Sequence, residues 1–84
     1  MNRLLRATMG KCDRIVLASI ETRDGLRCVD IFRTNSGAIF WDEWRRDPED
    51  LRGWQATGQR AKNAFETEAA ALRSARQAIN WMIS

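Results

Sequence analysis

The chain has 84 residues, of which 44% are hydrophobic and 30% charged, and its formal net charge at pH 7 is +3. This composition is typical of one soluble globular domain and excludes a disordered tail. No apolar run reaches the ~20 residues of a membrane span, and the first ten residues lack the apolar centre of a signal peptide. We therefore expect one cytoplasmic domain at residues 13–84, preceded by a basic N-terminal arm at residues 1–12.

A hairpin is predicted directly after the arm. Residues 14–20 are apolar and β-branched, and residues 26–33 alternate apolar and polar side chains. Asp24-Gly25 between them is a favoured pair for a two-residue turn. That turn sets Leu17 opposite Phe32. Since side chains alternate along a strand, one face of the sheet is predicted to carry five apolar residues. These are Val16, Ala18, Ile20, Val29 and Ile31.

A third strand is predicted after the loop at residues 35–37, where Gly37 occupies a left-handed position. This loop length places Trp41 opposite Ile31 on the same apolar face, and a one-residue slip would move every side chain to the other face. The same register sets Asp30 against Asp42. Like charges directly opposite are unfavourable, unless an arginine or a partner lies between the two carboxylates.

The segment Asp47-Pro48-Glu49-Asp50 is typical of a helix start, with a capping Asp, Pro in the first position and acids in the first turn. It predicts a short helix near residues 48–53, which Gly53 can end. Residues 54–64 show no clear period. We interpret them as a loop or as a short fourth strand.

A C-terminal helix is predicted from the N-cap Thr67 to about Met82. Trp81 falls nearly opposite Leu72 on such a helix and should face away from the sheet. The apolar stripe comprises Ala69, Leu72, Ala75, Ile79 and Met82. Together the elements predict an α+β fold, in which a three- or four-stranded antiparallel meander packs against one C-terminal helix.

Few residues in the chain suit catalysis. It has no His and no Tyr, and its five glycines occur singly. Cys12 and Cys28 form no C-x-x-C motif and have no base beside them, so we expect free thiols. The carboxylates between residues 42 and 50 do not match a calcium-binding loop and are interpreted as helix caps and solvated charge. The sequence therefore predicts a protein that is not an enzyme and that holds neither a cofactor nor a metal ion.

One hypothesis is nucleic-acid binding. The run Gly58–Ala64 is basic, and the order of a short N-terminal segment, three antiparallel strands and a C-terminal helix resembles the double-stranded RNA-binding domain. The resemblance implies that Arg60 and Lys62 contact phosphates. The chain departs from that family because it has no His for the loop between the first two strands and carries acids at Glu66-Thr67-Glu68. Three cations of the arm would add phosphate contacts: Arg3, Arg6 and Lys11.

Protein binding is the hypothesis that fits the sequence best. Residues 39–54 hold three of the four tryptophans, and Trp and Arg are the residues that most often anchor interfaces. Trp41 is assigned to the core. The second face of the sheet is apolar and would be exposed unless the arm or residues 45–64 cover it. The predicted contact residues are Trp44, Arg45, Arg46, Arg52, Trp54, Phe32, Phe40 and Trp81.

These residues predict a small module that occludes or bridges a partner protein without catalysing a reaction. Stand-alone domains of this size often serve as accessory or inhibitory proteins in phages and mobile elements, an expectation that rests on size alone. A third hypothesis is a self-associating structural protein, which would form a homodimer through an exposed sheet face or edge.

Overall fold

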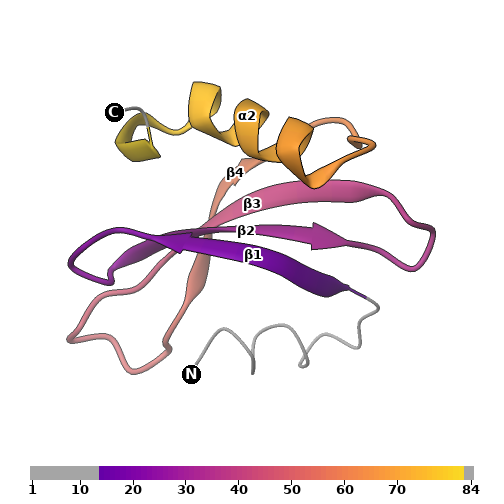
Figure 1. Cartoon of the computed structure of the whole chain (residues 1–84). Helices are drawn as coiled ribbons and strands as arrows, with labels where there is room; N and C mark the ends of the chain where they lie inside the picture. The colour runs from indigo at the N-terminus through magenta and orange to yellow at the C-terminus, as the bar shows by residue number, and fades with distance from the viewer. Residues whose placement is uncertain (1–13, 83–84) are drawn as a thin grey trace.

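The computed structural model describes residues 14–82, and the predicted arm at residues 1–12 lies outside them. Four strands form one antiparallel sheet in the order β1-β2-β3-β4, and a helix lies across one face of it (Figure 1). The fold is α+β, and the fourth strand is present. The elements are β1 (Ile15–Glu21), β2 (Arg27–Arg33), β3 (Ile39–Arg45), β4 (Gln55–Arg60), the helix α2 (Glu68–Ala78) and the 3₁₀ turn η1 (Asn80–Met82).

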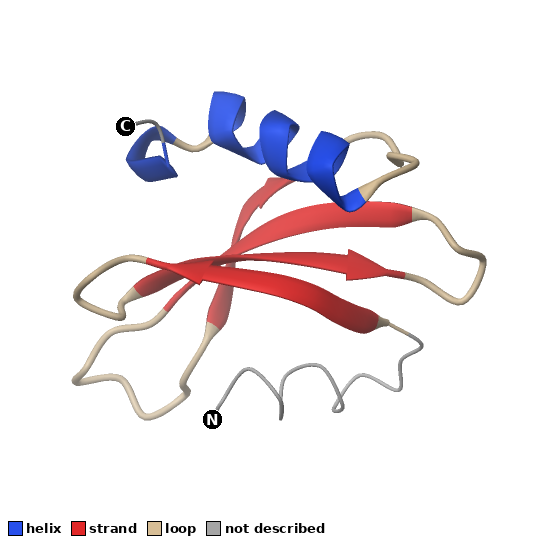
Figure 2. Cartoon of the chain, viewed as in Figure 1, coloured by secondary structure: helices blue, strands red, loops and turns tan. Residues whose placement is uncertain are grey.

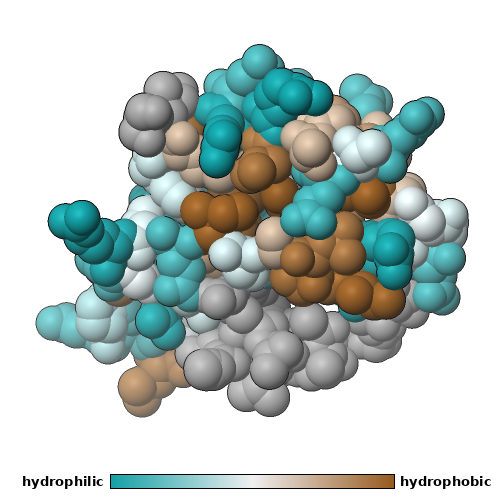
Figure 3. Space-filling view, viewed as in Figure 1, coloured by the Kyte–Doolittle hydropathy of each residue, from teal (hydrophilic) through white to brown (hydrophobic). Residues whose placement is uncertain are grey.

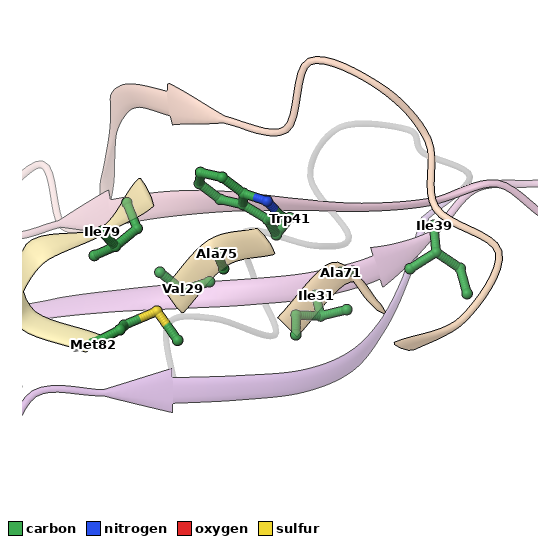
Figure 4. Close-up of a cluster of buried hydrophobic side chains, with 8 residues drawn as sticks. All are labelled: Val29, Ile31, Ile39, Trp41, Ala71, Ala75, Ile79 and Met82. Atoms are coloured by element: carbon green, nitrogen blue, oxygen red, sulfur yellow. The ribbon is translucent and has the colours of Figure 1, made fainter. Parts of the chain in front are cut away.

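The core lies between the sheet and α2. Ala71 and Ala75 are fully buried on the helix, and their small side chains let it lie close to β2 and β3 (Figure 4). Trp41 is 3% exposed and its indole Nε1 donates to Ser74 Oγ at 3.1 Å, so the largest core side chain also ties β3 to the helix. The core cluster comprises Val29, Ile31, Ile39, Trp41, Ala71, Ala75, Ile79 and Met82.

The hairpin between β2 and β3 has the predicted register. Ile31 pairs with Trp41 and Asp30 with Asp42. The loop at residues 35–37 closes with Gly37 N donating to Thr34 O at 2.9 Å, and Gly37 has a φ of +92°. Gly is favoured there because a side chain at positive φ is strained.

The turn between β1 and β2 is wider than the predicted two residues. Thr22 N donates to Arg27 O at 2.9 Å, so residues 23–26 form the loop. The Asp24 carboxylate accepts from Thr22 Oγ1 at 2.6 Å and from Leu26 N at 3.0 Å, and these bonds lower its pKa. The pairing of Ile20 with Val29 is unchanged, because the wider loop keeps the same register.

The predicted register fails farther along β1. A bulge lies between Val16 and Ala18, so Val16 pairs with Phe32 and the extra residue is Leu17. Because a bulge reverses the alternation of side chains, Val16 leaves the helix-covered face and Leu17 packs against the core. The prediction that placed Val16 in the core and Leu17 opposite Phe32 is therefore wrong.

The short helix expected near residues 48–53 does not form. Two consecutive turns replace it, because the chain must reverse between two neighbouring antiparallel strands. Asp47 stabilises the first of these turns instead of a helix. Its carboxylate accepts from Glu49 N at 3.0 Å, and its backbone O accepts from Asp50 N at 2.9 Å. The chain then enters β4, where Gln55 pairs with Arg45.

The C-terminal helix starts as predicted, with Thr67 Oγ1 accepting from Ala70 N at 3.0 Å, but it ends at Ala78. Ile79 is extended, with φ −104° and ψ 115°, and η1 follows. Within the helix the buried residues are Ala71 and Ala75, and Ala69, which was predicted to lie on the apolar stripe, is exposed. Within residues 14–82, no helix has the length and apolar character needed to cross a membrane.

Candidate functional site

The connection between β3 and β4 brings four of the eight predicted contact residues to one end of the sheet: Arg45, Arg46, Arg52 and Trp54. We call residues 46–54 the β3–β4 loop, which extends past the strand ends beside the β1–β2 turn (Figure 2). Arg45 precedes this loop and is exposed, as is Arg52 within it. Residues that the sequence placed at a strand end and on a helix are thus brought together by one irregular loop.

The base of the β3–β4 loop is fastened to the β1–β2 turn through Arg46. Its backbone N donates to Leu26 O at 2.9 Å, and its side-chain Nε donates to Gly25 O at 2.9 Å. The guanidinium carbon lies 4.6 Å from the centroid of the Trp54 ring, within the range of a cation–π contact. Arg46 and Trp54 are both half-buried, so they support the loop as well as forming part of its surface.

The far end of the β3–β4 loop presents an apolar side chain that the sequence analysis missed. Leu51 is 99% exposed, and Figure 3 shows an isolated apolar surface at this end of the molecule. Its neighbours are held by Asp50, whose carboxylate accepts from Arg52 Nη2 at 2.8 Å and from Gln55 Nε2 at 3.1 Å. The only signal in the sequence was one Leu among charged residues, which by itself predicts nothing.

The Asp50–Arg52 pair predicts a pH dependence of the loop. The bonds from Arg52 hold the pKa of Asp50 far below its ordinary value. A lowered folded-state pKa stabilises the ordered loop above the usual carboxyl pKa, and this contribution is lost as pH falls through the folded-state pKa. In an NMR titration, we expect Arg52→Ala to raise the Asp50 pKa toward its ordinary value, while Arg45→Ala leaves it unchanged. Equal titration curves in the two variants would contradict the pairing.

The second face of the sheet, which α2 does not cover, is more polar and more buried than expected. Asp30 is fully buried and accepts from Ser19 Oγ at 2.6 Å. Arg14 meets Asp42 with both terminal nitrogens, at 3.2 and 3.3 Å, so an arginine pairs with one of the two opposed carboxylates. The same guanidinium lies 3.6 Å from the Phe32 ring centroid.

The aromatic residues of this second face are half-buried instead of open. The Phe32 and Phe40 rings are stacked, with centroids 5.9 Å apart and an interplanar angle of 29°. Trp44 is half-buried as well, and its indole Nε1 donates to Asp42 Oδ1 at 2.9 Å. We therefore place the centre of the candidate contact surface on the β3–β4 loop and not on these rings.

Trp81 has a structural position, contrary to the prediction that it faces away from the sheet. The break at Ile79 turns it inward, and its Nε1 donates to Glu43 Oε2 at 2.7 Å. Glu43 is 4% exposed. Its carboxylate also accepts from Thr57 Oγ1 at 2.8 Å and from Arg27 Nη1 at 3.5 Å. This buried carboxylate joins β2, β3, β4 and η1, and the sequence offered no sign of it.

The cations of the nucleic-acid hypothesis lie elsewhere. Arg60 ends β4 opposite Asp42 on the second face, and Lys62 follows it; both are exposed. The run that resembled the start of the last helix of a double-stranded RNA-binding domain lies partly in β4, a strand that the resemblance did not include. The remaining predicted cations lie outside the described residues: Arg3, Arg6 and Lys11.

No protein-family model, curated protein or solved structure gave a significant match to this chain. Among residues 14–82, no three His, Cys, Asp or Glu side chains are grouped as metal ligands. Cys28 is buried, and its Sγ donates to Asp30 Oδ1 at 3.9 Å.

Proposed function

We propose that this protein is a small non-enzymatic binding module that engages a partner protein through the β3–β4 loop. The observation that carries the proposal is Leu51, which is 99% exposed at the end of a loop whose neighbouring side chains are held in place. Burying a Leu side chain stabilises a complex by roughly 1.5–3 kcal/mol. Leu51 gains this only when a partner covers it.

The order within the loop supports the same role. The Arg46 bonds to the β1–β2 turn hold one end, and the Asp50 bonds to Arg52 and Gln55 hold the other. A loop that is already ordered loses less conformational entropy on binding than a flexible one, which favours affinity. The loop is therefore suited to insert Leu51 into an apolar pocket of a partner.

The charges around Leu51 describe the complementary surface. Exposed cations at Arg45 and Arg52 flank the exposed acids Asp47 and Glu49 in the sequence, which supplies a mixed polar rim around an apolar centre. A loop of this length covers less than the roughly 800 Å² per partner of a stable interface. The β1–β2 turn, which Arg46 joins to the loop, supplies adjacent surface. The proposed role is to occlude or bridge the partner, as an accessory or inhibitory protein does.

The test is Leu51→Asp in the full chain, with Ser36→Asp as the matched control on the exposed loop at the other hairpin. We expect Leu51→Asp to weaken capture of a partner from host lysate at least tenfold while the unfolding midpoint stays unchanged, because Leu51 packs on nothing. Ser36→Asp should retain capture. Capture that is equal in the two variants would contradict the proposal.

Light scattering at micromolar concentration tests the self-association hypothesis with the same variants. If the partner is a second copy, the native chain is a dimer and Leu51→Asp is a monomer. A dimer that persists in Leu51→Asp would place the contact on another surface, such as the outer edge of β1, which pairs with β2 alone in the sheet.

A further inference from the structure

A cationic pocket lies on a different part of the molecule from the β3–β4 loop. It has a volume of about 510 Å³, and its lining includes Arg14, Arg60 and Lys62 together with Phe40 and Asp42. The register explains the convergence. Asp42 pairs with Arg60, so both side chains lie on the second face of the sheet. Ala61 packs against the core, and the next residue, Lys62, returns to that face.

The charges of this pocket are unbalanced. Among residues 14–82, one carboxylate lines it, that of Asp42, and it is already paired with Arg14 at 3.2 Å. Arg60 and Lys62 are exposed, and neither forms an ion pair within residues 14–82. Two neighbouring cations that form no ion pair within residues 14–82 attract an anionic group, and phosphate is an anion that Arg and Lys side chains commonly bind.

The pocket also has an aromatic wall. Phe40 stacks on Phe32, and the Arg14 guanidinium lies 3.6 Å from the centroid of the Phe32 ring. Phe32 thus already has a cation on its ring, while the Phe40 ring also lines the pocket. A Phe ring beside a phosphate-binding cation is the arrangement with which proteins hold an unpaired base.

We propose that this pocket binds one nucleotide unit, with its phosphate on Arg60 and Lys62 and its base against Phe40. A free nucleotide and a single strand of RNA or DNA both carry this unit. A duplex does not offer it, because its bases are stacked inside the helix. The proposal is independent of the protein-binding loop, since Leu51→Asp leaves all residues of the pocket in place.

The main experiment measures binding of a fluorescent ten-residue oligothymidylate to the full chain by anisotropy. The test variant is Arg60→Ala/Lys62→Ala. The matched control is Arg73→Ala/Arg76→Ala, which removes two exposed cations from α2. We expect the test variant to bind at least tenfold more weakly and the control to change less than threefold. The slope of log Kobs against log salt concentration should become shallower by roughly 0.7 for each lost phosphate contact.

Two competitors separate the sources of the nucleotide unit. Thymidine monophosphate that displaces the oligonucleotide at micromolar concentration identifies a free nucleotide as the ligand, and displacement by unlabelled strand alone identifies a single strand. Inorganic polyphosphate should compete at least tenfold less well than the strand, because it has no base for Phe40. Equal competition by polyphosphate, equal losses in both double variants, or no binding at low salt would each overturn the proposal.

Discussion

Replacing Trp41 with alanine is expected to lower the free energy of unfolding by about 3–5 kcal/mol, the usual cost of truncating a buried Trp. Trp41 is 3% exposed in the centre of the core and donates to Ser74 on the helix. Stabilities of small domains are about 5–15 kcal/mol, so this loss is a large share of the total. Chemical denaturation followed by circular dichroism measures it.

The control for this prediction is Trp44→Ala. Trp44 is half-buried on the second face, and its indole is hydrogen-bonded to Asp42. Its removal should cost less than half as much as that of Trp41 and leave a folded protein. If the two substitutions were equally destabilising, Trp41 would not be the main anchor between the sheet and the helix.

The second large effect is expected from Glu43→Ala. The carboxylate accepts from Trp81 Nε1 at 2.7 Å and from Thr57 Oγ1 at 2.8 Å in a site that is 4% exposed. Removing it leaves two donors without acceptors, and each unsatisfied buried group costs about 1–3 kcal/mol. We expect a loss of roughly 2–4 kcal/mol in unfolding free energy.

Hydrogen exchange at the Trp81 indole N–H distinguishes loss of this network from a general loss of stability. Relative to the native protein, Glu43→Ala should speed exchange of the Trp81 indole N–H more than exchange of the core amides of β2. Trp81→Phe is the matched control, because it removes one donor and leaves the carboxylate bound to Thr57. It should cost less than Glu43→Ala. A Glu43→Ala protein as stable as the native one would show that desolvation of the carboxylate cancels its bonds.

The strands and the start of the helix follow from short-range signals in the sequence. Gly37 requires a left-handed position, and only one loop length keeps Trp41 on the face of Ile31; both features are present. Thr67 caps the helix because its hydroxyl reaches the free N–H of Ala70. Such signals act within a few residues, so they are visible without the tertiary structure.

The candidate site was only partly predictable. Arg45, Arg46, Arg52 and Trp54 were identified by residue type, and the structure places them around one loop. Leu51 was missed because exposure depends on how the loop projects from the sheet. The predicted direction of the Trp81 side chain is wrong because the prediction assumes a continuous helix to Met82, whereas the backbone is extended at Ile79.

The sequence by itself determined the α+β class, the second hairpin and the helix cap, because turn chemistry and side-chain alternation are local. Tertiary structure alone decided the bulge at Leu17, the turns at residues 48–52 and the burial of Glu43. In each case, contacts with residues that are distant in the sequence override the conformation that the local sequence favours. The bulge in β1 packs Leu17 against the core. The β3–β4 loop must reverse the chain so that β4 can pair with β3. Glu43 is buried because Thr57 and Trp81 donate hydrogen bonds to its carboxylate.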